Sequence, residues 1–247
     1  MKKEISFSEH FLELKKRLTF TVVVFILSVI LGYYYSADLY SFLLKPLENY
    51  FIQNNLKREI IYTGLSEAFF TYLKLACYFG LFLSLPVLVW QIYAFLSPGL
   101  KRDEKRFVLP LFVFAPFLFF IGAVLVYYYI LPQVFSFFLS FEQTQASKTA
   151  PVVLEARVSE YLSLCLSIMI AFGLAFELPI ILIILAKIKL ISYKSLIKFR
   201  RFSIVIILIL AAILTPPDIL SQIFLAIIMI ILYELSILIC MYIEKKK

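Results

Sequence analysis

The sequence is poor in charge and in the residue types that build most catalytic and metal sites. Only 16% of its 247 residues are charged, against about a quarter in soluble domains. The single histidine, His10, excludes a histidine-rich metal site, and the three cysteines all lie inside apolar segments, where no disulfide is expected. The sequence also has no nucleotide-binding GxxxxGK[ST] motif and no recognisable nucleophile constellation. We therefore expect neither an enzyme nor a bound metal or cofactor.

Apolar residues take the place of the missing charges. Hydrophobic residues make up 63% of the chain and the mean hydropathy is +0.96. A helix that crosses a bilayer needs about 20 mostly apolar residues, and the sequence predicts an all-α integral membrane protein with six such helices. Prolines inside these helices predict kinks and a concave bundle. The expected spans, within a single domain of residues 1–247, are about 18–37, 68–96, 107–131, 158–186, 200–215 and 219–242.

The positions of Lys and Arg predict how these helices are oriented. The segments before span one, between spans two and three, between spans four and five, and after span six together hold eighteen Lys and Arg. The alternate segments hold five. Because basic residues favour the cytoplasmic side, both termini are expected in the cytoplasm, or in the corresponding compartment of an organelle. The net charge of +8 is then a signal of topology, and a nucleic-acid partner is not expected.

The last two expected spans are short. Thirteen residues separate Arg201 from Thr215, and fifteen separate Asp218 from Glu234. These stretches reach about 20–22 Å as helices, against about 30 Å of hydrocarbon. Either snorkelling and tilt absorb the mismatch, or the bilayer is locally thinned.

One carboxylate, Glu177, interrupts the apolar run 168–186. Pro179 removes an amide donor and disfavours helical geometry at Leu178, so the helix should bend there. An ionisable group inside a span usually faces the protein interior or water. Glu177 could fix the packing of helices, or it could be a polar contact point for a partner helix or a substrate.

Acidic residues also lie among basic ones near the N-terminus and in the first inner loop. Phe7, Phe11, Leu14 and Leu18 recur on one helical face, which predicts an interfacial helix. In the loop 97–111, two acids stand among four basic residues. These carboxylates could simply neutralise the Lys and Arg beside them.

Five motifs, in order, resemble those of the TatC family, the multispanning receptor subunit of the twin-arginine protein translocase. They cover nearly the whole chain and are "HFLELKKRL" (10–18), "LKPL" (44–47), "YAFLSPGLKRDEKRFVLPL" (93–111), "AFGLAFELPI" (171–180) and "LTPPDILSQ" (214–222).

This resemblance implies a site for the paired arginines of a signal peptide. The family's two receptor glutamates match Glu13 and Glu104, and a nearby family aromatic matches Phe95. A guanidinium pairs with a carboxylate through two nitrogens, which a lysine cannot reproduce. Lys15 and Arg17, from the first motif, belong to the same implied site.

The resemblance also implies partners and further functional positions. Glu177 matches a buried glutamate that contacts TatA/TatB-type single-span partners, and Pro46, Asp218 and Gln222 match other positions important to the family. Implied too are twin-arginine precursor proteins as cargo, a homo-oligomeric receptor complex, transport driven by the proton-motive force, and a bacterial inner membrane or an organellar one.

Two departures from the family pattern concern the signal site. Lys15 stands where the family usually has arginine, and Asp103 where it often has histidine.

The rival function is a proton-coupled small-solute transporter, with Glu177 and Asp218 as proton carriers. A transporter of that kind should have a closed polar cavity and pseudo-symmetric halves, whereas a receptor should have a groove open to lipid.

Overall fold

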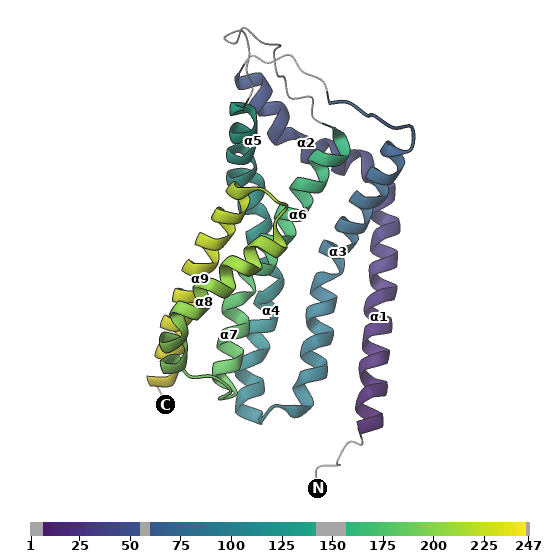
Figure 1. Cartoon of the computed structure of the whole chain (residues 1–247). Coiled ribbons are helices and arrows are strands. Elements are labelled where there is room, and N and C mark those ends of the chain that lie inside the picture. The colour runs from purple at the N-terminus through teal and green to yellow at the C-terminus, as the bar shows by residue number, and fades with distance from the viewer. Residues whose placement is uncertain (1–6, 55–59, 142–156, 246–247) are drawn as a thin grey trace.

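The structure is a computed structural model that describes residues 7–54, 60–141 and 157–245 (Figure 1). Within these ranges the chain is helical, apart from turns and one isolated bridge between Ile61 and Arg157. The all-α prediction is therefore confirmed. The helices are α1 (Phe7–Tyr34), α2 (Ser36–Gln53), α3 (Glu67–Leu96), η1 (Ser97–Gly99), α4 (Arg102–Leu125), η2 (Val126–Ile130), α5 (Leu131–Ser140), α6 (Val158–Phe176), α7 (Leu178–Lys187), α8 (Tyr193–Leu214) and α9 (Ile219–Lys245).

Five helical segments of the described chain are long and apolar enough to cross a membrane. α8, the expected fifth span, is not among them, because basic residues including Lys194, Lys198 and Arg201 occupy its first half. The count of six spans thus stays a prediction, as does the orientation. The five segments are Phe11–Tyr34, Glu67–Gly99, Arg102–Ser140, Val158–Lys187 and Ile219–Lys245.

Two segments are more continuous than the sequence suggested. The N-terminal interfacial helix is part of the same helix as the first span, because α1 runs unbroken from Phe7 to Tyr34. The third span was expected to end near residue 131, but η2, a π-helical turn, carries the helix on into α5 and Ser140.

The predicted bend at Glu177 is confirmed. α6 ends at Phe176, and α7 begins at Leu178 with Pro179 in its first turn. The backbone N–H of Glu177 bonds the Leu174 carbonyl at 3.1 Å, three residues back, in place of an α-helical bond. The break sets the glutamate side chain at the junction of two helices.

The two ends of the bundle differ. The start of α1, the α3–α4 turn, the α7–α8 turn and the end of α9 lie together (Figure 1). We call this the basic end, because residues 11–17, 97–106, 187–201 and 245 bring its Lys and Arg there. Helix α2 lies across the opposite end, here called the α2 end, and the α8–α9 turn stops short of it (Figure 1).

An exposed ion pair joins α8 to α9. Arg200 Nη2 lies 2.6 Å from Glu234 Oε2, and the two side chains are 46% and 43% exposed. Glu234 bounds the short apolar stretch of α9 on the side away from the turn, and Arg200 is next to Arg201, which bounds that of α8.

Glycines allow two pairs of helices to cross closely. A Cβ added to Gly32 of α1 would lie 2.9 Å from the Phe79 ring of α3. On Gly122 of α4, a Cβ would lie 2.8 Å from the backbone oxygen of Phe172 in α6. The second contact involves backbone that cannot rotate away, so it fixes the distance between α4 and α6.

Gly122→Ala should destabilise the bundle by about 2 kcal/mol, the usual cost of overpacking a core. In a chain of this size that corresponds to a melting temperature lower by about 4–8 °C in detergent. Gly99→Ala is the matched control, because its Cβ would meet no atom within 4 Å. Equal melting temperatures for the two variants would show that α4 and α6 can move apart at no cost.

Candidate functional site

An acid–guanidinium pair lies on α1 at the basic end. Arg17 Nη2 and Nε donate to the same oxygen of Glu13, at 2.6 and 3.0 Å. The third guanidinium nitrogen, Nη1, donates to Gln91 Oε1 of α3 at 3.1 Å. The side chains of Glu13 and Arg17 are 30% and 28% exposed, so water reaches both. Arg17 therefore connects the proposed receptor acid of α1 to α3.

A small hollow opens beside this pair, between α1 and α3, with a volume of about 130 Å³. Phe95, near the end of α3, contributes to its wall, and Arg17, Thr21 and Gln91 are its polar members. The structure thus brings Glu13, Arg17 and Phe95, all singled out from the sequence, to one place. The Lys15 side chain is exposed and is not part of this wall. The lining residues are Leu14, Arg17, Leu18, Thr21, Leu88, Gln91, Ile92, Phe95 and Leu96.

Glu104 has a structural role in the first turn of α4. Its Oε2 accepts the backbone N–H of Lys101, the residue before the helix, at 3.0 Å, which is the half of a capping box that the acidic residue supplies. A carboxylate there also opposes the positive end of the helix. Glu104 is half-buried, whereas Asp103 beside it is exposed. The start of α1 and the α3–α4 turn share the basic end, so Glu13 and Glu104 both belong to it (Figure 1).

Glu177 faces a second, larger hollow of about 410 Å³. Its Oε1 is buried and has no hydrogen-bond partner in the described part of the chain. A buried carboxyl oxygen without a partner is costly. A role limited to fixing helix packing would give it a bond within the bundle, so the observation favours a contact with another molecule. The walls come from α3, α4, α6 and α7, and are Leu85, Leu88, Val89, Ile92, Leu96, Phe112, Ala115, Phe119, Leu174, Glu177, Ile180, Ile181, Ile184 and Leu185.

Pro46 frees a backbone carbonyl that attaches α2 to the bundle. A proline has no N–H to donate four residues back, so no α-helical bond reaches the Phe42 carbonyl. The Tyr127 hydroxyl donates to that oxygen at 2.7 Å, and its ring stacks on Phe42 with centroids 4.6 Å apart. Tyr161 donates likewise to the Leu43 carbonyl at 2.7 Å. Two hydroxyls, from η2 and α6, thus hold α2 across its end of the bundle.

Tyr127→Phe should lower stability by about 1 kcal/mol, the net worth of one hydrogen bond, and the melting temperature by about 2–4 °C. In a Pro46→Ala background the backbone N–H gained at this position can bond the Phe42 carbonyl, so the effect of Tyr127→Phe should shrink. Tyr128→Phe is the matched control, because its side chain is largely exposed. Thermal melts of the four variants test this, and strictly additive effects of Pro46→Ala and Tyr127→Phe would contradict it.

Asp218 caps α9. Its Oδ1 accepts the Ser221 N–H at 2.7 Å, while the Gln222 N–H bonds its backbone oxygen at 3.3 Å. Its Oδ2 and the Ser221 hydroxyl are buried without a partner in the described residues. Asp218 and Gln222, predicted as functional, thus lie together at the start of α9. The adjoining α8–α9 turn, through Pro216 and Pro217, faces α6 across a hollow of about 730 Å³.

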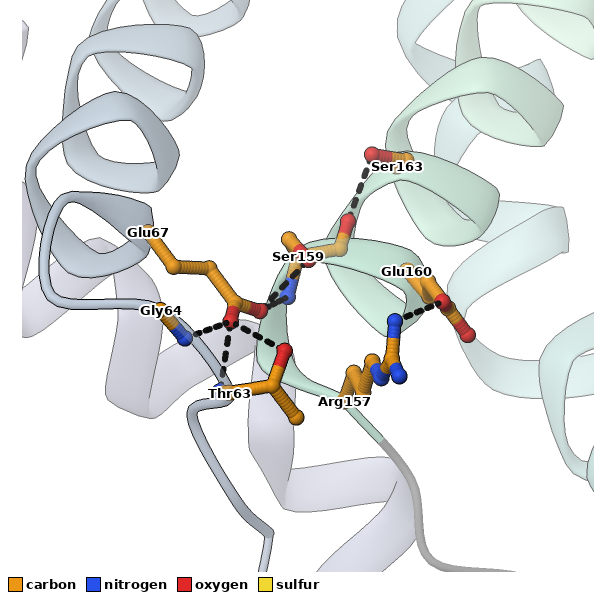
Figure 2. A network of polar contacts seen from close by, with 7 residues as sticks. All are labelled: Thr63, Gly64, Glu67, Arg157, Ser159, Glu160 and Ser163. Carbon is orange, nitrogen blue, oxygen red and sulfur yellow. Dashed lines mark hydrogen bonds and ion pairs between the residues drawn. The ribbon is translucent and has the colours of Figure 1, made fainter.

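Glu67 is a residue that the sequence analysis missed. Figure 2 shows its two carboxylate oxygens at the centre of a network at the α2 end. One oxygen accepts the Thr63 N–H at 2.7 Å and the Gly64 N–H at 3.2 Å, and the other accepts the Ser159 hydroxyl at 2.6 Å. Thr63 is only four residues before Glu67, so this contact could have been suspected from the sequence. Ser159 is 92 residues after Glu67, and its contact could not.

Lys74 extends the polar contacts between these two helices. Its Nζ donates to Ser163 Oγ of α6 at 2.7 Å. The Ser163 hydroxyl in turn donates to the Ser159 carbonyl (Figure 2). The starts of α3 and α6 are therefore joined by side chains from both.

Long apolar helices, a carboxylate within the apolar bundle and one strongly basic end define a polytopic membrane protein. Three comparisons give its family. A model of the family "Sec-independent protein translocase protein (TatC)" matches residues 9–227. The Sec-independent protein translocase protein TatC of Rickettsia prowazekii (strain Madrid E) is 46% identical over 239 residues, which are 97% of this chain and 94% of that protein. A TatC-like protein of Reclinomonas americana, ymf16, is 35% identical over 96% of this chain and 87% of its own.

A solved structure of this family has the same fold. The crystal structure of a twin-arginine translocase receptor, TatC, in DDM matches this fold with a TM-score of 0.80 at 31% identity. The match covers 94% of this chain and 99% of that one. The chain belongs to the TatC family. It is a core subunit of the twin-arginine translocase, part of a protein-transport complex, a multi-pass inner-membrane protein and not an enzyme.

Proposed function

We propose that the basic end faces the cytoplasm and receives the twin-arginine signal peptides of precursor proteins. The observation that carries this is the contact between Glu13 and Arg17, in which a carboxylate accepts a guanidinium through two nitrogens. A signal arginine could make the same contact. The hollow beside it, with Phe95 in its wall, is largely apolar and suits the apolar part of a signal. The excess of Lys and Arg at this end supports the orientation.

Glu104 is the second acid of the proposed receptor. Its bond to the Lys101 amide uses one site on Oε2, and an ionised carboxylate offers about four. The capping bond also holds the side chain in a defined place at the start of α4. Two fixed acids at one end match two arginines in the ligand.

Glu177 is the proposed contact for a TatA/TatB-type single-span partner. Its buried oxygen without a partner in the described residues, in an otherwise apolar hollow, is complementary to a polar side chain on a transmembrane helix. We further propose that such partners are recruited after the signal has bound, and that the receptor complex contains several copies of this chain. Transport is then driven by the proton-motive force.

The rival function, a proton-coupled small-solute transporter, is less well supported. Of its two candidate proton carriers, Asp218 is engaged in capping α9. Family membership also favours the translocase role.

The test is co-purification of the full-length protein with a twin-arginine precursor and with its Lys-Lys variant. The lysine variant should bind roughly 10- to 100-fold more weakly, because an ammonium cannot make the two-nitrogen contact. Equal recovery of the two precursors would refute arginine recognition at this end.

A further inference from the structure

The carboxylate proposed as a receptor for guanidinium already holds one. Arg17 is one helical turn after Glu13 and bonds its Oε1 through Nε and Nη2. The contact has the donor geometry that a signal arginine would use. Any guanidinium that reaches this oxygen in the same way meets Arg17 there.

Gln91 keeps Arg17 at this place. Its Oε1 accepts from Arg17 Nη1 at 3.1 Å across the interface between α1 and α3. The bond uses a nitrogen that does not contact Glu13. Arg17 can therefore release Glu13 and stay attached to α3, beside the same hollow.

The pair is also weak enough to exchange. Both side chains are about 30% exposed, and a partly hydrated ion pair four residues apart on a helix contributes little to stability. A signal arginine that brings further contacts from the rest of its peptide can replace it. A ligand that offers only a loosely placed cation cannot.

We propose that Arg17 is an internal competitor that occupies Glu13 until a signal arginine displaces its guanidinium. The inference rests on the proposed function of Glu13 as a signal receptor. Arg17 then lowers the affinity for every ligand of Glu13 and sets a threshold that weak cationic segments do not pass. If Arg17 instead bound the signal directly, it would raise the affinity for the signal peptide.

The experiment measures the dissociation constant of a fluorescent twin-arginine signal peptide for the full-length protein in nanodiscs. Arg17→Gln should tighten binding about two- to fivefold, which corresponds to the usual range for a hydrated ion pair. In a Glu13→Gln background, Arg17→Gln should have no effect, because nothing is left to compete for. Arg17→Lys keeps the charge without the two-nitrogen contact, so it should tighten binding by a smaller factor, and it serves if Arg17→Gln does not fold.

Arg102→Gln is the matched control for loss of charge, because Arg102 is exposed at the same end and makes no ion pair in the described ranges. A similar gain in Arg102→Gln, or a gain from Arg17→Gln that persists with Glu13→Gln, would assign the effect to long-range repulsion and overturn the inference. Weaker or unchanged binding in Arg17→Gln would also overturn it. If Glu13→Gln alone leaves binding unchanged, the proposed receptor role of Glu13 fails, which is a separate result.

Discussion

Replacing Glu13 and Glu104 together by glutamine should weaken the binding of a twin-arginine signal peptide by about 100-fold. Each substitution keeps the shape of the side chain and removes its charge, and a hydrogen bond to a charged group contributes about 1.5–3 kcal/mol. Each single variant should therefore lose roughly tenfold. The measurement is a binding titration with purified full-length protein.

Asp103→Asn is the matched control for this experiment. It removes a neighbouring charge from an exposed side chain, so it should change affinity by less than about twofold, as exposed charges usually do. Thermal melts of Glu104→Gln show whether loss of the capping bond to Lys101 has disturbed α4. Undiminished binding in the double variant, with an intact melt, would remove both acids from the receptor site.

Glu177→Ala should weaken co-purification of a single-span partner by about 3- to 20-fold, the range expected for one hydrogen bond between transmembrane helices. Glu177→Gln still offers polar atoms that can hydrogen-bond a partner, so it should lose less. The melting temperature of the isolated protein should stay the same or rise in Glu177→Ala, because the substitution removes a buried oxygen that lacks a partner among the described residues.

These two readouts separate the two roles considered for Glu177. A residue that fixes helix packing would lower the melting temperature when removed and leave partner recovery in proportion to folded protein. Glu48→Ala is the control, since Glu48 is an exposed acid on α2 and does not line the hollow. Full partner recovery in Glu177→Ala would exclude the proposed contact.

What the sequence predicted well was local. The break at Glu177 follows from Pro179 two residues later, and the apolar runs follow from composition, so both could be read without knowing any neighbour. The end of the third span was missed because η2 carries the helix past the expected boundary into α5. A short π-helical turn between two α-helices produces no periodic pattern of apolar residues from which it could be predicted.

What the sequence could not predict depends on partners far along the chain. Tyr127 bonds a carbonyl 85 residues before it, and Glu67 bonds a serine 92 residues after it. Gln91 lies 74 residues from Arg17. Nothing in the spacing of these residues indicates the contact, because it exists only after the helices have packed.

The Arg200–Glu234 pair limits which helices can lie along α8 and α9. Both residues stand about 22–24 Å from the turn at a rise of 1.5 Å per residue, and both remain exposed. An ordinary single span with about 30 Å of apolar length would bring several ångströms of hydrocarbon side chain against charged groups. A neighbour that fits this face must therefore have a shorter apolar segment, or must carry a polar residue at the depth where the two charges meet.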